Sequence, residues 1–308
     1  MLNDYISVVG NFICCVTKGL APIDKRPASQ CYHIPVLTSN EGGPVIPYYV
    51  VDAFASKPFE GNPAGVCVLD DWIDDDLMQR IAAENRLSET AFAVRQAPGS
   101  YLLRWFTPAA EIDLCGHATF GTAFVLFRFY ETDASELRFH APYKGYDLAC
   151  TRMDDRIQMA FPRITPSPFA FGQEMADAVG AMPSKVLATE RDLVLVFDDE
   201  AIVNDMRPDM QKVALLEHGL SVYVTAPSAT WDYVARAFWP KIGIPEDPVC
   251  GSMQSALVPY WSERLGKREL VCRQTSARGG TVWCEDTGDA VLISGTGALY
   301  LQGHILER

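Results

Sequence analysis

The 308-residue sequence lacks several features that define whole classes of proteins. It has no run of about eighteen apolar residues, so it predicts no membrane-spanning helix. It has no cluster of Lys and Arg, and its formal net charge is −13, which argues against binding to a nucleic-acid backbone. It has no Cys/His group at zinc spacing, no Rossmann fingerprint and no phosphate loop. We therefore expect no metal, nucleotide or flavin cofactor.

Disulfide pairing is also not indicated. The nine cysteines are odd in number and contain no CxxC pair. A chain of this length, which suggests about two domains, buries enough apolar surface without cross-links. We expect free thiols in a cytoplasmic protein.

The first 46 residues differ from the rest of the chain. Residues 1–19 are mildly apolar without a basic start, and residues 20–46 are rich in Pro, Ser and Gly. We interpret residues 1–46 as an N-terminal extension whose composition is compatible with disorder. A regular pattern of strands begins at residue 47.

Residues 47–308 contain two similar series of elements. Strand-like runs precede a Cys-Gly pair in each series, and a buried, apolar helix follows the pair, over residues 118–129 and 253–261. Further strand-like runs then close each series. This repetition predicts an α+β protein with two pseudo-symmetric domains, each with sheet wrapped around one central helix. The site would lie between the halves, where both helix starts point.

The two Cys-Gly pairs could bind an anion. Cys115-Gly116 and Cys250-Gly251 each precede a helix, and the start of a helix offers free N–H donors and a partial positive charge. Glycine also lets the backbone approach a ligand closely. The alternative is plain helix capping, with His117 or Ser252 serving the helix. A third candidate for anion binding is Arg278 before Gly279-Gly280, but this pattern is more typical of a turn.

Four linked motifs resemble those of the PhzC/PhzF-like family of phenazine-biosynthesis proteins. They occupy residues 51–64, 85–92, 104–119 and 246–252, in the order and spacing of that family. The resemblance implies the fold of diaminopimelate epimerase, in which each domain is a curled, mostly antiparallel sheet around a central helix. It also implies a first domain of residues 47–155 plus 295–308 and a second domain of residues 156–294.

The resemblance further implies a cofactor-independent isomerase and, as is usual in the family, a homodimer. Its substrate would be a small carboxylate-bearing molecule, similar to trans-2,3-dihydro-3-hydroxyanthranilate. Glu89 of the Ser-Glu-Thr motif would be the acid/base that moves a proton between carbons, with His117 and Asp247 as the other catalytic residues. The residues expected to bind substrate are Asn62, Ser88, Gly116, Gly251 and Ser252.

Two other functions compete with this one. Cys115 and Cys250 match the positions where related racemases and epimerases carry two catalytic thiols, so a two-thiol amino-acid racemase or epimerase is an alternative. Against it, His117 stands where those enzymes usually have Asn. The second alternative is a binder of small molecules without catalysis, which would more often lack one of the polar residues.

Overall fold

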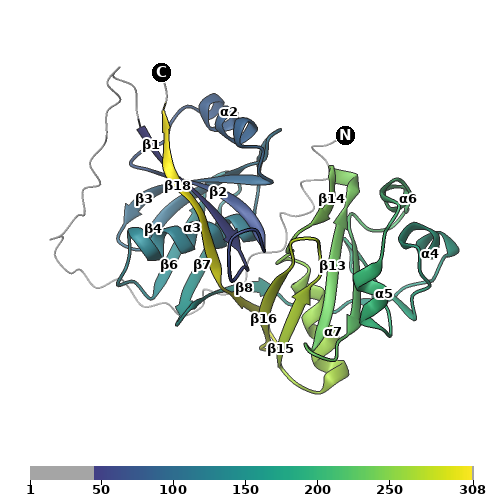
Figure 1. Ribbon diagram of the computed structural model, residues 1–308. Helices are drawn as coiled ribbons and strands as arrows, with labels where there is room; N and C mark the ends of the chain where they lie inside the picture. The colour runs from purple at the N-terminus through teal and green to yellow at the C-terminus, as the bar shows by residue number, and fades with distance from the viewer. Residues whose placement is uncertain (1–44, 307–308) are drawn as a thin grey trace.

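The computed structural model describes residues 45–306, which form two halves joined side by side (Figure 1). Of the predicted N-terminal extension, residues 1–44 lie outside the described residues, and Val45 and Ile46 already belong to the first strand. No helix within residues 45–306 has the length and apolar character needed to cross a membrane.

The first half begins with a strand pair and contains two helices. Its elements are β1 (Val45–Ala53), β2 (Asn62–Leu69), α2 (Asp75–Asn85), β3 (Glu89–Ala97), β4 (Ser100–Phe106), β5 (Glu111–Ile112), α3 (Gly116–Phe129), β6 (Glu136–Ala141), β7 (Tyr146–Met153) and β8 (Arg156–Pro162).

The second half repeats this plan with extra short helices. Its elements are β9 (Ser167–Pro168), α4 (Gln173–Val179), β10 (Lys185–Ala188), β11 (Leu193–Val196), α5 (Glu200–Asp205), α6 (Met210–Leu215), β12 (Val222–Pro227), β13 (Tyr233–Trp239), η2 (Pro240–Ile242), β14 (Ile244–Asp247), α7 (Gln254–Leu265), β15 (Glu269–Gln274), β16 (Gly280–Asp286) and β17 (Ala290–Gly295). The last strand, β18 (Gly297–Leu306), follows.

Strand pairing follows the same order in both halves. β2 runs parallel to β3 as β11 does to β12, and β4 runs parallel to β6 as β13 does to β15. The intervening neighbours are antiparallel, including β3–β4 and β12–β13. The repeat in topology confirms the predicted α+β fold of two pseudo-symmetric halves with mostly antiparallel sheet.

The halves are joined by strand pairs that obey the same symmetry. β8 and β17, the final strands of the two repeats, pair antiparallel with each other. The chain after β8 pairs with β10 of the second half through β9, and the chain after β17 returns to pair with β1 through β18. Figure 1 shows β18 passing from the joint along the first half. The domain division predicted at residues 155 and 156 falls where β8 begins, and it stays a prediction.

Each half packs its curled sheet around one apolar helix. Ten of the fourteen residues of α3 are buried, and seven of the twelve residues of α7 are buried. Such helices are apolar on all sides because sheet covers them on all sides. Both helices also contact β8, so their N-terminal ends meet at the joint between the halves.

The second half contains three short helices that the sequence pattern does not predict. α4, α5 and α6 have only six or seven residues, too few for a helical period to stand out. Two of them do carry a capping residue: Asp199 accepts the N–H of Ala201, and Asp209 accepts the N–H groups of Gln211 and Lys212.

Phe161 of β8 lies at the joint, between the two helix starts. A Cβ atom added to Gly116 would lie 3.0 Å from Phe161 Cζ, and one added to Gly251 would lie 3.5 Å from the same atom. The side chain is 8% exposed. The aromatic ring therefore lies against both Cys-Gly pairs, and its contact is tighter at Gly116 than at Gly251.

We expect Phe161→Ala to destabilise the protein by about 3 kcal/mol or more, because it opens a cavity where the halves meet. Phe171, which is 45% exposed, provides the control, and Phe171→Ala should cost no more than about 0.5 kcal/mol. Urea unfolding of the three proteins measures both differences. Equal losses in the two variants would show that Phe161 does not hold the joint.

Candidate active site

Glu89 is the first residue of β3, a strand that pairs with β2 on one side and with β4 on the other. Helix α2 ends just before it, at Arg86 in the left-handed conformation, and half-buried Ser88 precedes it. Glu89 is only 7% exposed, although its position in sequence predicts an ordinary loop carboxylate. The fold thus buries an acid at the end of a central strand, facing the start of α3.

His117, in the first turn of α3, lies between Glu89 and Cys115. Its Nε2 atom is 3.0 Å from Glu89 Oε2, and its Nδ1 atom is 3.5 Å from Cys115 Sγ. The Nε2 and Oε2 atoms are at ion-pair distance but are not aligned as a hydrogen bond. Within the described residues neither atom has a hydrogen-bond partner. Both therefore keep hydrogen-bonding capacity for a substrate or a water molecule.

The neighbouring groups shift the pKa values of both Cys115 and His117. Burial, followed by the nearby Glu89, raises the pKa of the Cys115 thiol, so the sulfur is neutral near pH 7. Burial opposes a charge on His117, but Cys115 and Glu89 outweigh it and raise the pKa of His117 well above 6.5.

The same three side chains deserve comparison with a metal site. Each offers one ligand atom, and these atoms lie within 4.8 Å of one another. However, the sulfur approaches Nδ1 and the carboxylate approaches Nε2, and the lone pairs of these two ring nitrogens point in opposite directions. One ion can use only one of them, and a metal needs the thiolate rather than the thiol. The arrangement suits a proton relay better than a chelate.

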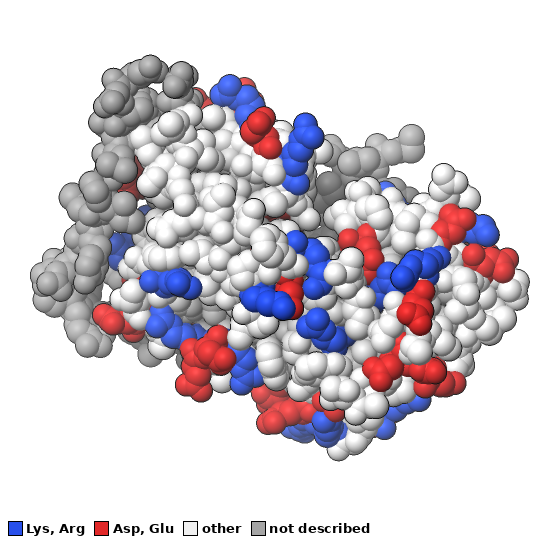
Figure 2. Space-filling view, viewed as in Figure 1, with Lys and Arg blue, Asp and Glu red and all other residues white. Residues whose placement is uncertain are grey.

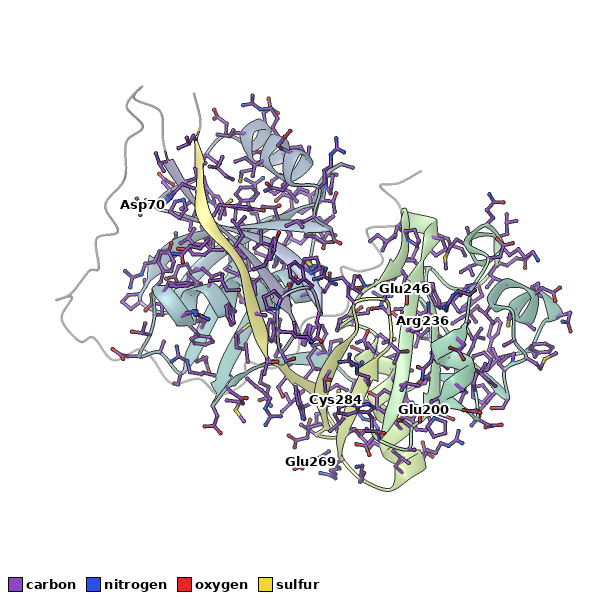
Figure 3. The ribbon with its side chains drawn as sticks, viewed as in Figure 1. Asp70, Glu200, Arg236, Glu246, Glu269 and Cys284 are labelled. Carbon is purple, nitrogen blue, oxygen red and sulfur yellow. The ribbon has the colours of Figure 1, made fainter. Side chains whose placement is uncertain are left out.

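Asp247 reaches the joint from the second half, at the end of β14. Arg236 of β13 holds this strand, since its Nε and Nη2 atoms donate to both carboxylate oxygens of the adjacent Glu246 at 2.7 and 3.1 Å (Figure 3). Asn62 Nδ2, from the first half, donates to Asp247 Oδ1 at 2.7 Å and to the Val249 carbonyl at 3.2 Å. Asn62 and Asp247, both predicted site residues, are therefore bonded across the halves.

Asp247 is electrostatically coupled to the group in the first half. Burial raises its pKa from 3.8 to about 6; the charge of His117 opposes this rise, and that of Glu89 adds to it. A carboxyl group with a pKa near 6 can hold or release a proton close to neutral pH. The coupling also indicates that Asp247, His117 and Glu89 share one region.

The second Cys-Gly pair mirrors the first. Cys250 Sγ lies 3.4 Å from the Oγ atom of Ser252, two residues further along the chain. This matches the 3.5 Å contact between Cys115 Sγ and His117 Nδ1. Gln274 holds the Cys250 backbone from both sides: its Oε1 accepts the Cys250 N–H at 2.8 Å, and its Nε2 donates to the Cys250 carbonyl at 2.9 Å. Burial raises the pKa of the Cys250 thiol far above 9. In both halves a neutral, buried thiol contacts the polar side chain that follows the glycine.

The structure thus brings the predicted residues together in two groups that meet at Phe161. Glu89, Cys115, Gly116 and His117 come from the first half; Asp247, Cys250, Gly251 and Ser252 come from the second, with Asn62 crossing between them. Sequence reasoning missed Gln274, Arg236 and Phe161. Their partners lie 24, 10 and 45 or more positions away in the chain, so no local motif marks them.

Access to this site is restricted. The side chains of His117 and Glu89 are 10% and 9% exposed. Two surface pockets of about 300 Å³ lie elsewhere, one beside Arg128 and Arg156 and one beside Trp72 and Tyr143, and none of the predicted site residues lines either of them. The carboxylate and the imidazole are therefore largely shielded from solvent.

We expect Asp247→Asn to stabilise the protein increasingly as pH rises. The folded pKa is raised, so the folded state holds a proton that the unfolded chain has already lost, and wild-type stability falls as pH rises through 6. The advantage of the variant should grow by about 1 kcal/mol between pH 5 and pH 7.5. Urea unfolding at both pH values measures it. An advantage that stays constant would contradict a raised pKa at Asp247.

Comparison with known proteins agrees with the resemblance seen in the motifs. Residues 51–303 match the family described as "Phenazine biosynthesis-like protein". An uncharacterized isomerase of Pseudomonas aeruginosa is 45% identical over 255 residues, which cover 83% of this chain and 96% of that one. The human phenazine biosynthesis-like domain-containing protein is 33% identical, over 84% of this chain and 98% of that one.

Solved structures support the fold. A PhzF-family protein of Enterococcus faecalis, 44% identical, superimposes with a TM-score of 0.83 over 85% of this chain and 100% of that one. A hydroxyproline epimerase of Agrobacterium vitis shares the fold at 10% identity, with a TM-score of 0.53 over 85% of this chain and 92% of that one. The predicted epimerase-like fold and isomerase class are therefore confirmed, and the chain belongs to the phenazine biosynthesis-like PhzC/PhzF family.

Proposed function

We propose that this protein is a cofactor-independent isomerase that moves a proton between two carbons of a small, carboxylate-bearing substrate, with Glu89 as the acid/base. One observation carries the proposal: Glu89 is buried, and its Oε2 atom lies 3.0 Å from His117 Nε2, while neither atom has a hydrogen-bond partner within the described residues. A buried carboxylate with a free oxygen and a neighbouring acid suits proton transfer.

The proposed reaction conserves all atoms and electrons. Glu89 accepts a proton from a C–H bond, and the electron pair of that bond delocalises toward the substrate's carboxylate. Helix starts at Gly116 and Gly251, together with the cationic His117, favour the negative charge that develops. Glu89 then returns the proton to a second carbon. Asp247 and Ser252 would orient the substrate, as would Asn62 and Ser88.

The acidic surface makes such local positive charge necessary. With a net charge of −13, the chain as a whole repels an anionic substrate. Figure 2 shows basic side chains dispersed among neutral and acidic ones on the visible face, rather than gathered in one band. Attraction at the site would therefore come from helix starts and from His117.

The geometry supports the carboxylate over the two-thiol alternative. A thiol base must ionise, whereas burial raises the pKa of both Cys115 and Cys250, and each sulfur contacts the side chain two residues on. A non-catalytic binder would show no proton exchange with any ligand. The family resemblance also supports a cytoplasmic homodimer without nucleic-acid or membrane partners, which sedimentation and localisation experiments would test.

Glu89→Gln should abolish proton exchange. We expect a loss of at least about 100-fold, because glutamine cannot accept the proton. Deuterium incorporation from heavy water into a panel of small carboxylic acids, followed by NMR, measures the rate. Glu84→Gln, at an exposed position of α2, is the control and should exchange at the wild-type rate. Wild-type exchange by Glu89→Gln would disprove the assignment.

The double variant Cys115→Ser/Cys250→Ser should retain exchange within about tenfold of wild type. A serine hydroxyl at position 115 still accepts a hydrogen bond from the protonated His117, and one at position 250 still bonds Ser252, but neither can replace a thiolate base. The corresponding double alanine variant should be slower, because these hydrogen-bond partners are lost. The same heavy-water assay applies. If the serine variant is inactive while Glu89→Gln is active, the racemase alternative is correct.

A further inference from the structure

Two loops, one from each half, meet beside the candidate active site. The first is the turn between β1 and β2, residues 54–61, and the second is the loop between β15 and β16, residues 275–279. The Gly61 N–H donates to the Gly279 carbonyl at 2.7 Å. Gly61 has φ +64°, and a Cβ atom there would lie 2.1 Å from the Ala53 carbonyl oxygen, so the turn has a single tight conformation.

Arg278 fastens these loops together. Its Nη2 atom donates to Asp52 Oδ1 at 2.6 Å and to the Glu60 carbonyl at 2.9 Å, and its Nε atom donates to the Gly61 carbonyl at 2.8 Å. Asp52 is 2% exposed and also accepts the Phe59 N–H through Oδ2 at 2.8 Å. A buried carboxylate of this kind needs a cationic partner, and Arg278 supplies it.

Both loops lead directly into the site. The first continues into Asn62, whose side chain donates to Asp247 and to the Val249 carbonyl. On the second, Ser276 Oγ donates to the Pro248 carbonyl at 2.7 Å and accepts the Gly279 N–H at 3.0 Å. Asn62 therefore holds Asp247, and Ser276 holds the next residue, Pro248, from two segments that Arg278 links.

We propose that Arg278 and Asp52 are positioning residues that lock the two loops, so that Asn62 holds Asp247 in place for proton transfer. The inference rests on the proposed function. It also bears on whether Arg278 binds an anion or belongs to a turn, the two possibilities that the sequence leaves open. The guanidinium binds carbonyl groups and a buried carboxylate of this chain, so its part is to join the halves and not to bind a substrate anion.

The consequence for Asp247 follows from the groups around it. Glu89 and His117 face it from the first half, and Cys250 and the Val249 amide lie on its own segment. Asn62 donates to it across the joint. A donor favours the charged carboxylate, so a displaced Asn62 leaves burial and Glu89 to hold the proton more tightly. Loosening the clamp should raise the pH at which Asp247 titrates.

A second ion pair gives a matched control. Arg163, just after β8, binds Asp286 of β16 with Nε and Nη2 at 2.8 and 3.1 Å. The side chains of Arg163 and Asp286 are 29% and 7% exposed, close to the 31% and 3% of Arg278 and Asp52. Arg163→Gln and Arg278→Gln thus remove similar pairs, but only the second removes a link to Asn62.

The experiment measures three quantities in wild type, Arg278→Gln, Asp52→Asn and Arg163→Gln: thermal stability, the titration of Asp247 followed by ¹³C-carboxyl NMR, and exchange in heavy water. We expect all three variants to lose some stability. In Arg278→Gln and Asp52→Asn alone, the Asp247 midpoint should rise by about one pH unit, and kcat should fall about tenfold with KM less affected. Arg278→Lys should give a smaller shift in the same direction, and it replaces the Gln variant if that variant does not fold.

The inference would be overturned if Arg278→Gln or Arg278→Lys had the same Asp247 midpoint and the same kcat as Arg163→Gln. Arg278 would then have a structural role only. Glu89→Gln, assayed in parallel, separates this from failure of the proposed function. If Glu89→Gln exchanges at the wild-type rate, the function is wrong, whereas the NMR titration still decides whether the clamp sets Asp247.

Discussion

The packing of Phe161 against Gly116 and Gly251 is the constraint on which the site depends. One aromatic ring fixes how close the two helix starts come, and therefore where His117 and Ser252 stand. A Cβ atom at Gly116 would crowd the ring at 3.0 Å, whereas one at Gly251 would touch it at 3.5 Å. The ring belongs to β8, which pairs with β17 of the second half, and β18 returns from β17 to pair with β1 of the first half. The pseudo-symmetric fold is thus the means by which two half-sites face each other.

Burial of charge is the cost of this arrangement and also the source of its chemistry. Glu89, His117 and Asp247 are all withdrawn from water. Burial raises the pKa of Asp247 to about 6, whereas the groups beside His117 hold its pKa well above 6.5, so a carboxyl group that titrates near neutral pH is coupled to a cationic imidazole. The fold compensates by pairing the charges that do not react: Asp52 with Arg278, Glu246 with Arg236 and Asp286 with Arg163. Burial of the reacting groups lowers the stability of the fold, and the ion pairs around them offset part of that loss.

Sequence reasoning predicted the fold class, the central helices and the family, because these depend on local patterns and on motifs that are short and linked. It also named Glu89, His117 and Asp247, but only through resemblance; spacing alone makes Glu89 an ordinary surface carboxylate. It could not foresee Gln274 clasping Cys250, or Arg278 reaching Asp52 across 226 positions. Such contacts depend on how distant strands pair, and a single sequence carries no local signal of that. The short helices α4–α6 were not predicted because six or seven residues are too few to show a helical period.

The central claim is that one carboxylate both removes and returns the proton. The most direct test uses the small carboxylic acid that incorporates deuterium fastest. It reacts with the enzyme in heavy water for less than one turnover, and the positions of protium and deuterium in the product are then determined. A single acid/base predicts product that retains protium at the receiving carbon, because Glu89 carries the same proton across, in wild type and in Cys115→Ser/Cys250→Ser alike. Product that is fully deuterated at that carbon from the first turnover would contradict the account, because the proton removed by Glu89 would then always be lost to solvent, or replaced by a second donor, before it could be returned.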